Sequence, residues 1–545
     1  MDGFYGPENR VGNARGSCSE AQDPLKERIL VFDTTLRDGE QAAGCRLDPG
    51  QKLEIARQLV KLGVDVMEVG FPQSSPRDFE SVSEISREIE GPTICALSRA
   101  LPSDVETCGQ ALRHAGKARI HTGLGVSDIH IMGKFKDPKY GANLDEKREH
   151  ALEMSIEAVE IAKSYTQDVE FYAEDAARAD REYLQEVIAS VTKAGATVVN
   201  IPDTTGYSVP EQFGGLVKEV KASMPNMDRA LLSVHCHNDL GLAVSNTLAG
   251  IANGAQQVEV TINGIGERAG NAALEEVVMA LRTRKDYFSI DTGIDTTEIY
   301  HTSHLVARAF GHQIPYNKPI VGFNAFAHSA GIHVDGFLKD RRTYEIMQPE
   351  QVGYPRSRIV LTARSGRHAV KNRLKELGYT LTAERLDAAY QRFIDIADKV
   401  TEVSDHALMA IVNGEPRAPK TFEMIELEFT GGLGQVAVAN VTVNARGTIL
   451  SAQSKGDGPV DATYKAISKA IGIPLALVEF SINTTGEGTD ALGEATVKVK
   501  DHATAIGHGA STDIVLASAL AYMDALSVIA ETQDTAAHGK TWGDT

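Results

Sequence analysis

Short β-rich runs alternate with helical segments from residue 28 to about residue 285 of this chain. The runs that predict strands are 28–33, 64–70, 93–97, 119–124, 168–174, 197–202, 231–237 and 256–263. Several of the intervening helical segments begin with a helix-start signal, such as Pro49 after Asp48. Eight strands, each followed by a helix over ~260 residues, match a (β/α)8 TIM barrel in number and length. A doubly wound open sheet is the alternative, but no glycine-rich dinucleotide turn follows the first strand.

The pattern changes after Asp286. Residues 290–375 are rich in Gly, Pro and His and predict mainly loops, whereas 383–412 carry apolar residues at helical intervals. Glycine and proline in 413–420 predict a linker. Alternating apolar residues beyond it predict antiparallel strands. We therefore expect a helical linker subdomain and then a C-terminal α+β domain.

The C-terminal region repeats itself. Three strands lead into a helix at 460–471, and three more lead into a helix at 512–529. The glycine-rich segments 456–458 and 507–509 are predicted to be turns that precede the two helices at equivalent places. In a βββα pseudo-repeat, two helix N-termini that face one cleft can bind the carboxylate of a small zwitterion. Turns that only cap the helices are an equally good interpretation.

These patterns divide the chain into five segments. They are a disordered tail at 1–27, a TIM-barrel domain at 28–290, linker subdomains at 291–415, a C-terminal domain at 416–531 and a flexible tail at 532–545. The first 27 residues have no apolar core, so they match neither a signal peptide nor a transit peptide.

The overall charge of the chain excludes some partners. Its 545 residues include 74 acidic and 55 basic side chains, for a formal net charge of −19. We expect no nucleic-acid or anionic-membrane partner, because both bind clustered cations. Five scattered cysteines do not suggest a disulfide framework, which favours a reducing, cytoplasmic location. No apolar run reaches the ~20 residues of a membrane span.

Charged residues follow the first predicted strand directly, in the segment 33–41. Arg37 and Asp38 would damage a core, but they suit the mouth of a barrel, where the catalytic residues of TIM-barrel enzymes gather. A solvated turn is the alternative.

The seventh predicted strand ends in His235-Cys236-His237. Side chains two positions apart on a strand share a face, so the two histidines can bind one metal ion. Two imidazoles suit Zn, Mn, Co or Fe, and a carboxylate partner extends the choice towards Mg. Such a pair is more often packing than ligand, but this one falls at the same barrel end as Asp38.

The segment 263–271 follows the eighth predicted strand. Its glycines let the backbone approach a ligand closely, and Asn271 can offer an amide oxygen to a hard cation. A tight turn before a capped helix is the alternative. His121, Glu174 and Thr204 lie at further strand ends. Polar residues at six of the eight strand ends together predict an enzyme.

At these motifs the chain resembles the α-isopropylmalate synthases, part of the DRE-TIM metallolyase group that also includes citramalate and homocitrate synthases. The resemblance covers about 28–531 and includes 33–41, 235–241, 264–271, 328–333 and the C-terminal βββα pair. It implies a Claisen-type condensation of acetyl-CoA with 3-methyl-2-oxobutanoate. The products would be 2-isopropylmalate and CoA, in the first committed step of leucine biosynthesis.

The resemblance also implies a metal centre and a substrate site. One divalent ion (Mn²⁺, Mg²⁺ or Zn²⁺, with K⁺ allowed as an activator) would be bound by Asp38, His235, His237 and Asn271. Arg37, with Thr204 assisting, would bind the 2-oxo acid's carboxylate, because a guanidinium pairs with a carboxylate through two parallel hydrogen bonds. The pocket for this acid would be lined by His121, Tyr172 and Glu174.

Two residues are implied as candidates for the catalytic base. They are Glu267 and His333, the latter contributed by the neighbouring subunit of a homodimer, with linker subdomains that complete the active site. The C-terminal domain resembles the leucine-binding regulatory domain of the same enzymes, which implies feedback inhibition by leucine. The residues expected near this effector are Gly456, Asp457, Gly458, Asp461, Gly507 and Gly509.

One position departs from the family pattern. Many isopropylmalate synthases have serine where Tyr172 stands, whereas some citramalate synthases have tyrosine, so pyruvate is the alternative substrate. His121 favours isopropylmalate synthases, and Asp38 argues against homocitrate synthases, which usually have Glu there. Two other classes are a catalytically inactive leucine-sensing homologue and a metal-dependent aldolase or lyase. Retention of every expected metal ligand disfavours the first, and the regulatory domain disfavours the second.

Overall fold

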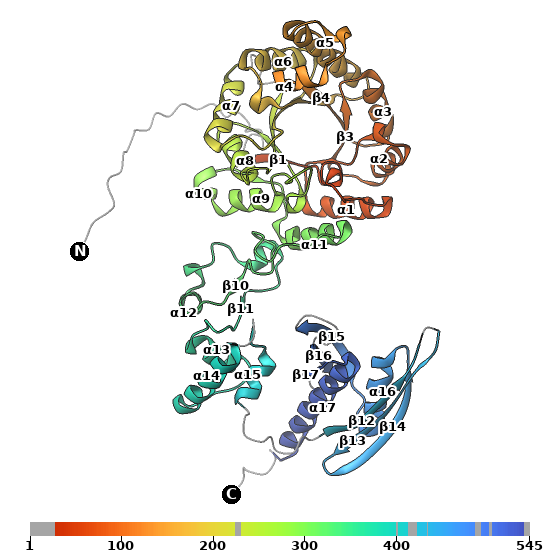
Figure 1. Cartoon of the computed structure of the whole chain (residues 1–545), viewed down its shortest axis with the longest axis vertical. Helices are drawn as coiled ribbons and strands as arrows, with labels where there is room; N and C mark the ends of the chain where they lie inside the picture. Colours follow the sequence, from red (N-terminus) through yellow and green to blue (C-terminus); the bar gives the residue numbers. More distant parts are fainter. Residues whose placement is uncertain are drawn as a thin grey trace, which may run out of the picture. The chain divides into compact units, whose positions relative to one another are not determined.

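The structure is a computed structural model that describes residues 28–223, 230–398, 402–412, 422–432, 434–485, 492–500 and 504–538. The predicted tail at 1–27 and the predicted linker at 413–420 lie outside the described residues. The chain divides into two compact units (Figure 1). The first holds the described residues up to His328 together with Ile332–Ile359, and the second holds Ser329–Gly331 and the described residues from Val360 onwards. The predicted 291–415 region is therefore shared between the two units.

Eight parallel strands close into a barrel in the first unit, which confirms the predicted fold class (Figure 1). They are β1 (Arg28–Asp33), β2 (Val66–Glu68), β3 (Thr93–Arg99), β4 (Ala118–Gly125), β5 (Asp168–Glu174), β6 (Val198–Asp203), β7 (Leu231–Cys236) and β8 (Gln257–Val260). The strands follow chain order, and β1 pairs with both β2 and β8, which closes the cylinder. A short strand, β9 (Asp291–Thr292), also pairs with the start of β1.

Helices surround the barrel and begin where local signals place them. The principal ones are α1 (Pro49–Leu62), α2 (Pro76–Glu88), α3 (Pro102–Leu112), α5 (Leu144–Lys163), α6 (Arg181–Ala194), α7 (Pro210–Ser223), α8 (Ala243–Ala252) and α9 (Leu274–Thr283). The shorter α4 (Asp128–Lys134) and α10 (Lys285–Phe288) accompany them. At the start of α1, the Asp48 carboxylate accepts a hydrogen bond from the Gln51 backbone N–H at 2.9 Å, and the Gln51 side chain accepts one from the Asp48 N–H. This reciprocal capping explains why α1 begins at its predicted residue.

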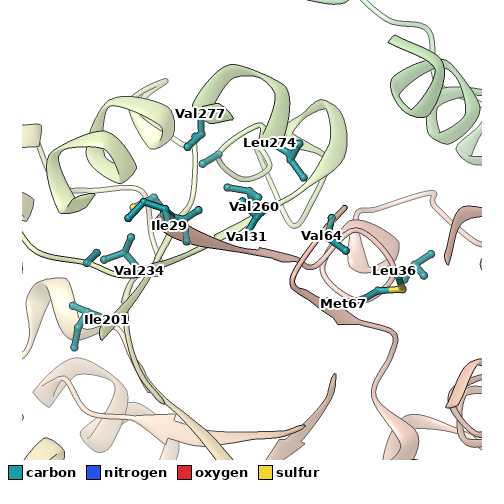
Figure 2. Close-up of a cluster of buried hydrophobic side chains, with 14 of the residues drawn as sticks. Ile29, Val31, Leu36, Val64, Met67, Ile201, Val234, Val260, Leu274 and Val277 are labelled. Atoms are coloured by element: carbon teal, nitrogen blue, oxygen red, sulfur yellow. The ribbon is translucent and has the colours of Figure 1, made fainter. Parts of the chain in front are cut away.

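The core of the barrel unit lies between the strands and the helices. Alternate residues of a strand point to opposite faces, and the outward set here is apolar and fully buried, as for Val31 and Val260. Figure 2 shows these side chains beside Leu274 and Val277 of α9. The inward set is largely polar, which is unusual for a barrel of this type, whose interior is commonly filled by branched aliphatic residues. These polar inward side chains include residues of the candidate site.

The loop prediction for residues 290–375 was wrong in part. This region contains the helices α11 (Ile299–Phe310), α12 (Gly331–Lys339) and α13 (Arg367–Glu376), besides the paired β10 (Ala327–His328) and β11 (Arg358–Ile359). In α11 the residues Ile299, Leu305 and Val306 are buried, but intervening histidines obscure this pattern in the sequence. The predicted helical stretch 383–412 contains two helices, α14 (Ala383–Ala397) and α15 (Asp405–Val412).

The C-terminal domain is the predicted βββα pseudo-repeat. Its first half is β12 (Phe422–Thr430), β13 (Ala437–Ala445), β14 (Thr448–Gly456) and α16 (Pro459–Ile471). Its second half is β15 (Ala476–Thr485), β16 (Leu492–Lys500), β17 (Thr504–Ser511) and α17 (Ile514–His538). Each half forms an antiparallel three-stranded sheet. Helix α17 extends beyond the predicted start of a flexible tail at 532, and residues 539–545 lie outside the described residues.

Gly507 and Gly509 do not form the predicted turn before α17. Both lie within β17, on the face that packs against α17. A Cβ atom on Gly507 would collide with the Ala521 carbonyl, and one on Gly509 would collide with that of Ala517. These glycines therefore serve close packing of the helix on the strand, so the prediction that they form a turn was wrong, whereas their place near an effector stays a prediction. Gly456 and Gly458 do precede α16 as predicted.

None of the helices within the described ranges combines the length and the apolar character of a membrane span.

Candidate metal centre and active site

Three side chains from distant parts of the chain meet at the carboxyl ends of the barrel strands. Asp38 follows β1, His235 lies in β7 and His237 follows it. One ligand atom from each lies within 4.8 Å of the others. The side chains are buried, and the Nε2 atoms of the two histidines are 3.1 Å apart. The structure thus brings together the three predicted ligands, which we call the Asp-His-His cluster.

Asn271 completes this group from the loop after β8. Its Nδ2 donates a hydrogen bond to Asp38 Oδ1 at 2.7 Å. Its Oδ1 is buried without a hydrogen-bond partner within the described chain, which leaves it available to a cation. Gly266 makes room for this arrangement, since a Cβ atom there would lie 2.6 Å from Asp38 Oδ1. A larger residue at 266 would therefore fill the space between the donors.

The charge states of the cluster suit a divalent metal ion. Burial lowers the pKa of His235 and of His237 to about 4, so both imidazoles are neutral at pH 7, the form that binds metals. Burial alone would raise the pKa of Asp38, but the Arg37 guanidinium holds it well below its usual range. An ionised carboxylate, two neutral imidazoles and an amide oxygen suit Mn²⁺, Mg²⁺ or Zn²⁺. The residues present therefore fit a divalent metal ion.

Arg37 is held from two sides beside this cluster. Its Nε donates to Glu68 Oε2 at 2.5 Å, and its Nη1 donates to Asp38 Oδ2 at 2.7 Å. Glu68 closes β2 and is fully buried. In the part of the chain that the structure describes, no hydrogen bond uses Arg37 Nη2. The guanidinium is thus fixed in orientation and keeps one N–H edge for a ligand.

Two predicted pocket residues, His121 and Tyr172, pack against each other. Their rings meet edge to face with centroids 4.9 Å apart, and the Tyr172 hydroxyl donates to the Ser98 carbonyl at 3.1 Å. His121 is 1% exposed, and its Nδ1 lies 2.9 Å from Glu68 Oε1. A Cβ atom on Gly123 would lie 2.7 Å from the Tyr172 ring, so Gly123 provides the space for this ring. His121 therefore lies in the layer below the mouth.

Glu174 and Thr204 are held by partners of their own. The Glu174 carboxylate lies 2.5 Å from Lys134 Nζ of α4. Burial alone would raise its pKa, but hydrogen bonds from His130 and Lys134 lower the pKa to about 2. Thr204 Oγ1 accepts a hydrogen bond from the Asp175 backbone N–H at 2.9 Å. Neither side chain hydrogen-bonds to the Asp-His-His cluster in the described ranges, so the structure does not bring them into direct contact with it.

The two candidate bases differ in their placement. Glu267 lies beside the Asp-His-His cluster, because its backbone N–H donates to Asp38 Oδ1 at 3.2 Å, while its side chain is exposed. His333 is exposed on α12 and stacks on Tyr344, with ring centroids 4.3 Å apart. Among the described residues it has no hydrogen bond, ion pair or ring contact with the cluster. Within a single chain, only Glu267 is at the metal centre.

Sequence reasoning missed the charged residues that fill the barrel interior. Arg119 Nη1 donates to Glu170 Oε2 at 2.9 Å and to Gln257 Oε1 at 2.7 Å. Burial raises the pKa of Glu170 and of Glu259 to about 7. A usable signal was present, since a buried charge is rare and Glu259 stands between Val258 and Val260 in an apolar strand.

A cavity of about 360 Å³ opens beside Arg37. It lies between the loop after β1, helix α1 and the segment from Gly70 to the start of α2. Lys52 on its wall is paired with Glu40 and Asp78, at 2.7 Å each. Arg46 and Arg77 also line it, and neither forms an ion pair with another described residue. The cavity therefore presents positive charge next to the metal centre.

Three family models together match most of the chain. Residues 28–306 match the HMGL-like family, 320–401 match the homocitrate synthase post-HMGL domain-like family, and 400–530 match the LeuA allosteric (dimerisation) domain. The 2-isopropylmalate synthase of Carboxydothermus hydrogenoformans is 52% identical over 504 residues, which cover 92% of this chain and 97% of that protein. The enzyme of the same name from Heliobacterium modesticaldum is 49% identical, covering 93% and 97%. That from Aquifex aeolicus is 48% identical, covering 92% and 96%.

Proposed function

This chain belongs to the 2-isopropylmalate synthase family, and on that premise we propose that it condenses acetyl-CoA with 3-methyl-2-oxobutanoate. The products are 2-isopropylmalate and CoA. The observation that carries the proposal is the convergence of Asp38, His235 and His237 within 4.8 Å, next to an arginine with a free N–H edge. This arrangement offers one place for a cation and one for the carboxylate of a 2-oxo acid.

Each residue of the site is proposed to have a separate role in the reaction. The Asp-His-His cluster and Asn271 would hold a divalent ion, which would supply Lewis-acid polarisation of the keto carbonyl. Arg37 Nη2 orients the acid's carboxylate. The exposed carboxylate of Glu267, with His333 of a second subunit as the other candidate, takes a proton from the acetyl methyl group. The methyl carbon then bonds to the keto carbon, whose oxygen is protonated, and water cleaves the thioester to release CoA.

The function is tested by following CoA release with acetyl-CoA, Mn²⁺ and a series of 2-oxo acids. We expect the highest kcat/KM with 3-methyl-2-oxobutanoate. Activity with pyruvate alone would assign the chain to citramalate synthesis instead. An absence of CoA release with every acid would favour the leucine-sensing alternative.

Tyr172 is proposed to limit the size of the 2-oxo acid. Its ring is fixed by the Ser98 carbonyl and by His121, so a serine at this position leaves space that a branched side chain can fill. We expect Tyr172→Ser to raise the ratio of kcat/KM for 3-methyl-2-oxobutanoate over pyruvate about tenfold, since one or two buried methyl groups are worth ~1–3 kcal/mol. An unchanged ratio would remove Tyr172 from the pocket. Tyr183→Phe, a change at a tyrosine of α6, is the control.

The positive cavity beside Arg37 is proposed to take the phosphate-bearing part of acetyl-CoA. Arg46 and Arg77 supply charge there that no described residue neutralises. We expect Arg77→Ala to raise KM for acetyl-CoA about tenfold, equivalent to ~1.4 kcal/mol, with KM for the 2-oxo acid unchanged. Arg57→Ala, which removes an exposed arginine paired with Glu88 outside the cavity, should leave both constants unchanged. An equal effect of the two variants would argue against the cavity.

The C-terminal domain is proposed to bind leucine and to join two copies of the chain. The match to the LeuA allosteric (dimerisation) domain supports both roles. Helix α16 begins after Gly458 with Pro459 and no side-chain cap, so the N–H groups of Val460 and Asp461 are available to a carboxylate. Nearby, Asp461 Oδ2 accepts hydrogen bonds from the Asp457 N–H at 2.9 Å and from Lys465 at 2.7 Å. We propose the segment 456–461 as one wall of the leucine site.

A further inference from the structure

Glu259 lies directly behind one histidine of the metal centre. In the parallel pairing of β7 and β8, His235 and Glu259 are register partners, and both side chains belong to the inward set of the barrel. His235 Nδ1 and Glu259 Oε2 are 3.0 Å apart. Glu259 is 1% exposed. A buried carboxylate thus faces the ring nitrogen on the side away from the other ligands.

The tautomer that a metal ligand requires gives this contact a role. His235 Nε2 is the nitrogen that faces His237 and Asp38, so it is the nitrogen available to a cation. A neutral imidazole that binds a cation through Nε2 carries its hydrogen on Nδ1, and this hydrogen needs an acceptor. Neither His235 Nδ1 nor Glu259 Oε2 has a hydrogen-bond partner elsewhere in the described chain.

Glu259 is itself held in place. The Asn200 Nδ2 of β6 donates a hydrogen bond to Glu259 Oε1, which leaves Oε2 to face His235. His237 differs, because its Nδ1 is buried without any partner among the residues that the structure describes. Only one of the two imidazoles therefore has a carboxylate behind it.

We propose that Glu259 is a positioning residue of the metal centre. It accepts a hydrogen bond from His235 Nδ1, selects the tautomer whose Nε2 lone pair faces the cation, and fixes the orientation of the ring. Asn200 supports it from the neighbouring strand. The inference rests on the metal site of the proposed function and adds residues that touch neither the metal nor the substrate.

The test compares Glu259→Gln with Asp104→Asn in the full-length protein. Gln at 259 keeps the size of the side chain. Its amide oxygen still accepts the hydrogen bond from Asn200, so its NH₂ group, which cannot accept a hydrogen bond, faces His235 Nδ1. We expect the Kd for Mn²⁺, measured from free Mn²⁺ by electron paramagnetic resonance, to rise about ten- to a hundredfold. Excess Mn²⁺ should restore most of kcat. Asp104, a carboxylate at the start of α3 that is also 1% exposed but is bonded to Arg99, is the control, and its variant should keep the wild-type Kd.

The outcomes are distinct. An unchanged Mn²⁺ affinity in Glu259→Gln, or an equal loss in Asp104→Asn, would overturn the inference. If Glu259→Gln does not fold by circular dichroism, Asn200→Leu, which leaves the carboxylate but removes its donor, should weaken Mn²⁺ binding, and wild-type affinity there would also overturn it. Asp38→Ala separates this from the proposed function, because Mn²⁺ binding that survives Asp38→Ala refutes the metal site itself.

Discussion

Replacing Asp38 with alanine is expected to lower kcat/KM about 10³-fold or more, equivalent to at least ~4 kcal/mol of transition-state stabilisation. The substitution removes the one carboxylate of the proposed ligand set. It also deprives Arg37 Nη1, Asn271 Nδ2 and the Glu267 N–H of their shared acceptor. The substitution therefore removes a negative charge from the metal site and also releases the groups that Asp38 holds in position. Steady-state CoA release and Mn²⁺ binding measure the two consequences separately.

Metal removal provides the companion experiment. Treatment of the wild-type enzyme with EDTA should abolish CoA release, and added Mn²⁺ should restore it, whereas Asp38→Ala should stay inactive at any Mn²⁺ concentration. Asp48→Ala is a suitable control, because Asp48 caps α1 and its loss costs only about 1 kcal/mol of stability. More than a tenth of wild-type activity in Asp38→Ala would exclude this carboxylate from the metal centre.

Truncation after Val412 is expected to abolish inhibition by leucine. The change removes the whole βββα domain, including the proposed leucine site at 456–461. Inhibition requires that leucine bind one state of the protein more tightly than another, so without its site the effector has no means of shifting the populations. The activity that remains should be independent of leucine concentration. Assays of CoA release at increasing leucine concentrations provide the measurement.

A point variant guards against indirect effects of truncation on assembly. Asp461→Ala removes the acceptor of the Asp457 N–H and of Lys465 while leaving both sheets intact. We expect about a tenfold higher leucine concentration for half-inhibition, equivalent to ~1.4 kcal/mol, at unchanged kcat. Leucine inhibition that persists in the truncated chain would place the effector site outside the C-terminal domain.

The barrel strands could be predicted from sequence because their outward face repeats every two residues. The predicted bounds of β1 and β5 coincide with those in the structure, and α1 begins at the predicted Pro49. In these elements the local signals and the tertiary packing agree: apolar residues such as Val31 face the helices, and Asp48 caps α1. The approach of Asp38 to His235 followed from one rule, that all parallel strands of a barrel end at the same rim.

Contacts between side chains of neighbouring elements could not be predicted in the same way. Whether Glu259 faces His235 depends on the register of β7 against β8, which no local pattern encodes. The same holds for Gly507 and Gly509. Two glycines at this spacing are typical of turns, but here they let α17 pack closely against a strand. Helix α11 was predicted as a loop, because its histidines interrupt the helical pattern of its buried apolar residues.

The polar lining of the barrel constrains how this enzyme can diverge. Arg37 is paired with Glu68 and Arg119 with Glu170 in this largely buried interior, so a change in any one of the four leaves the opposite charge of its partner unpaired. An aliphatic core can change through single, independent substitutions between apolar residues of similar size. A substitution among these four residues therefore requires a compensating change in its partner, and new substrate preferences should arise first at uncharged positions such as Tyr172.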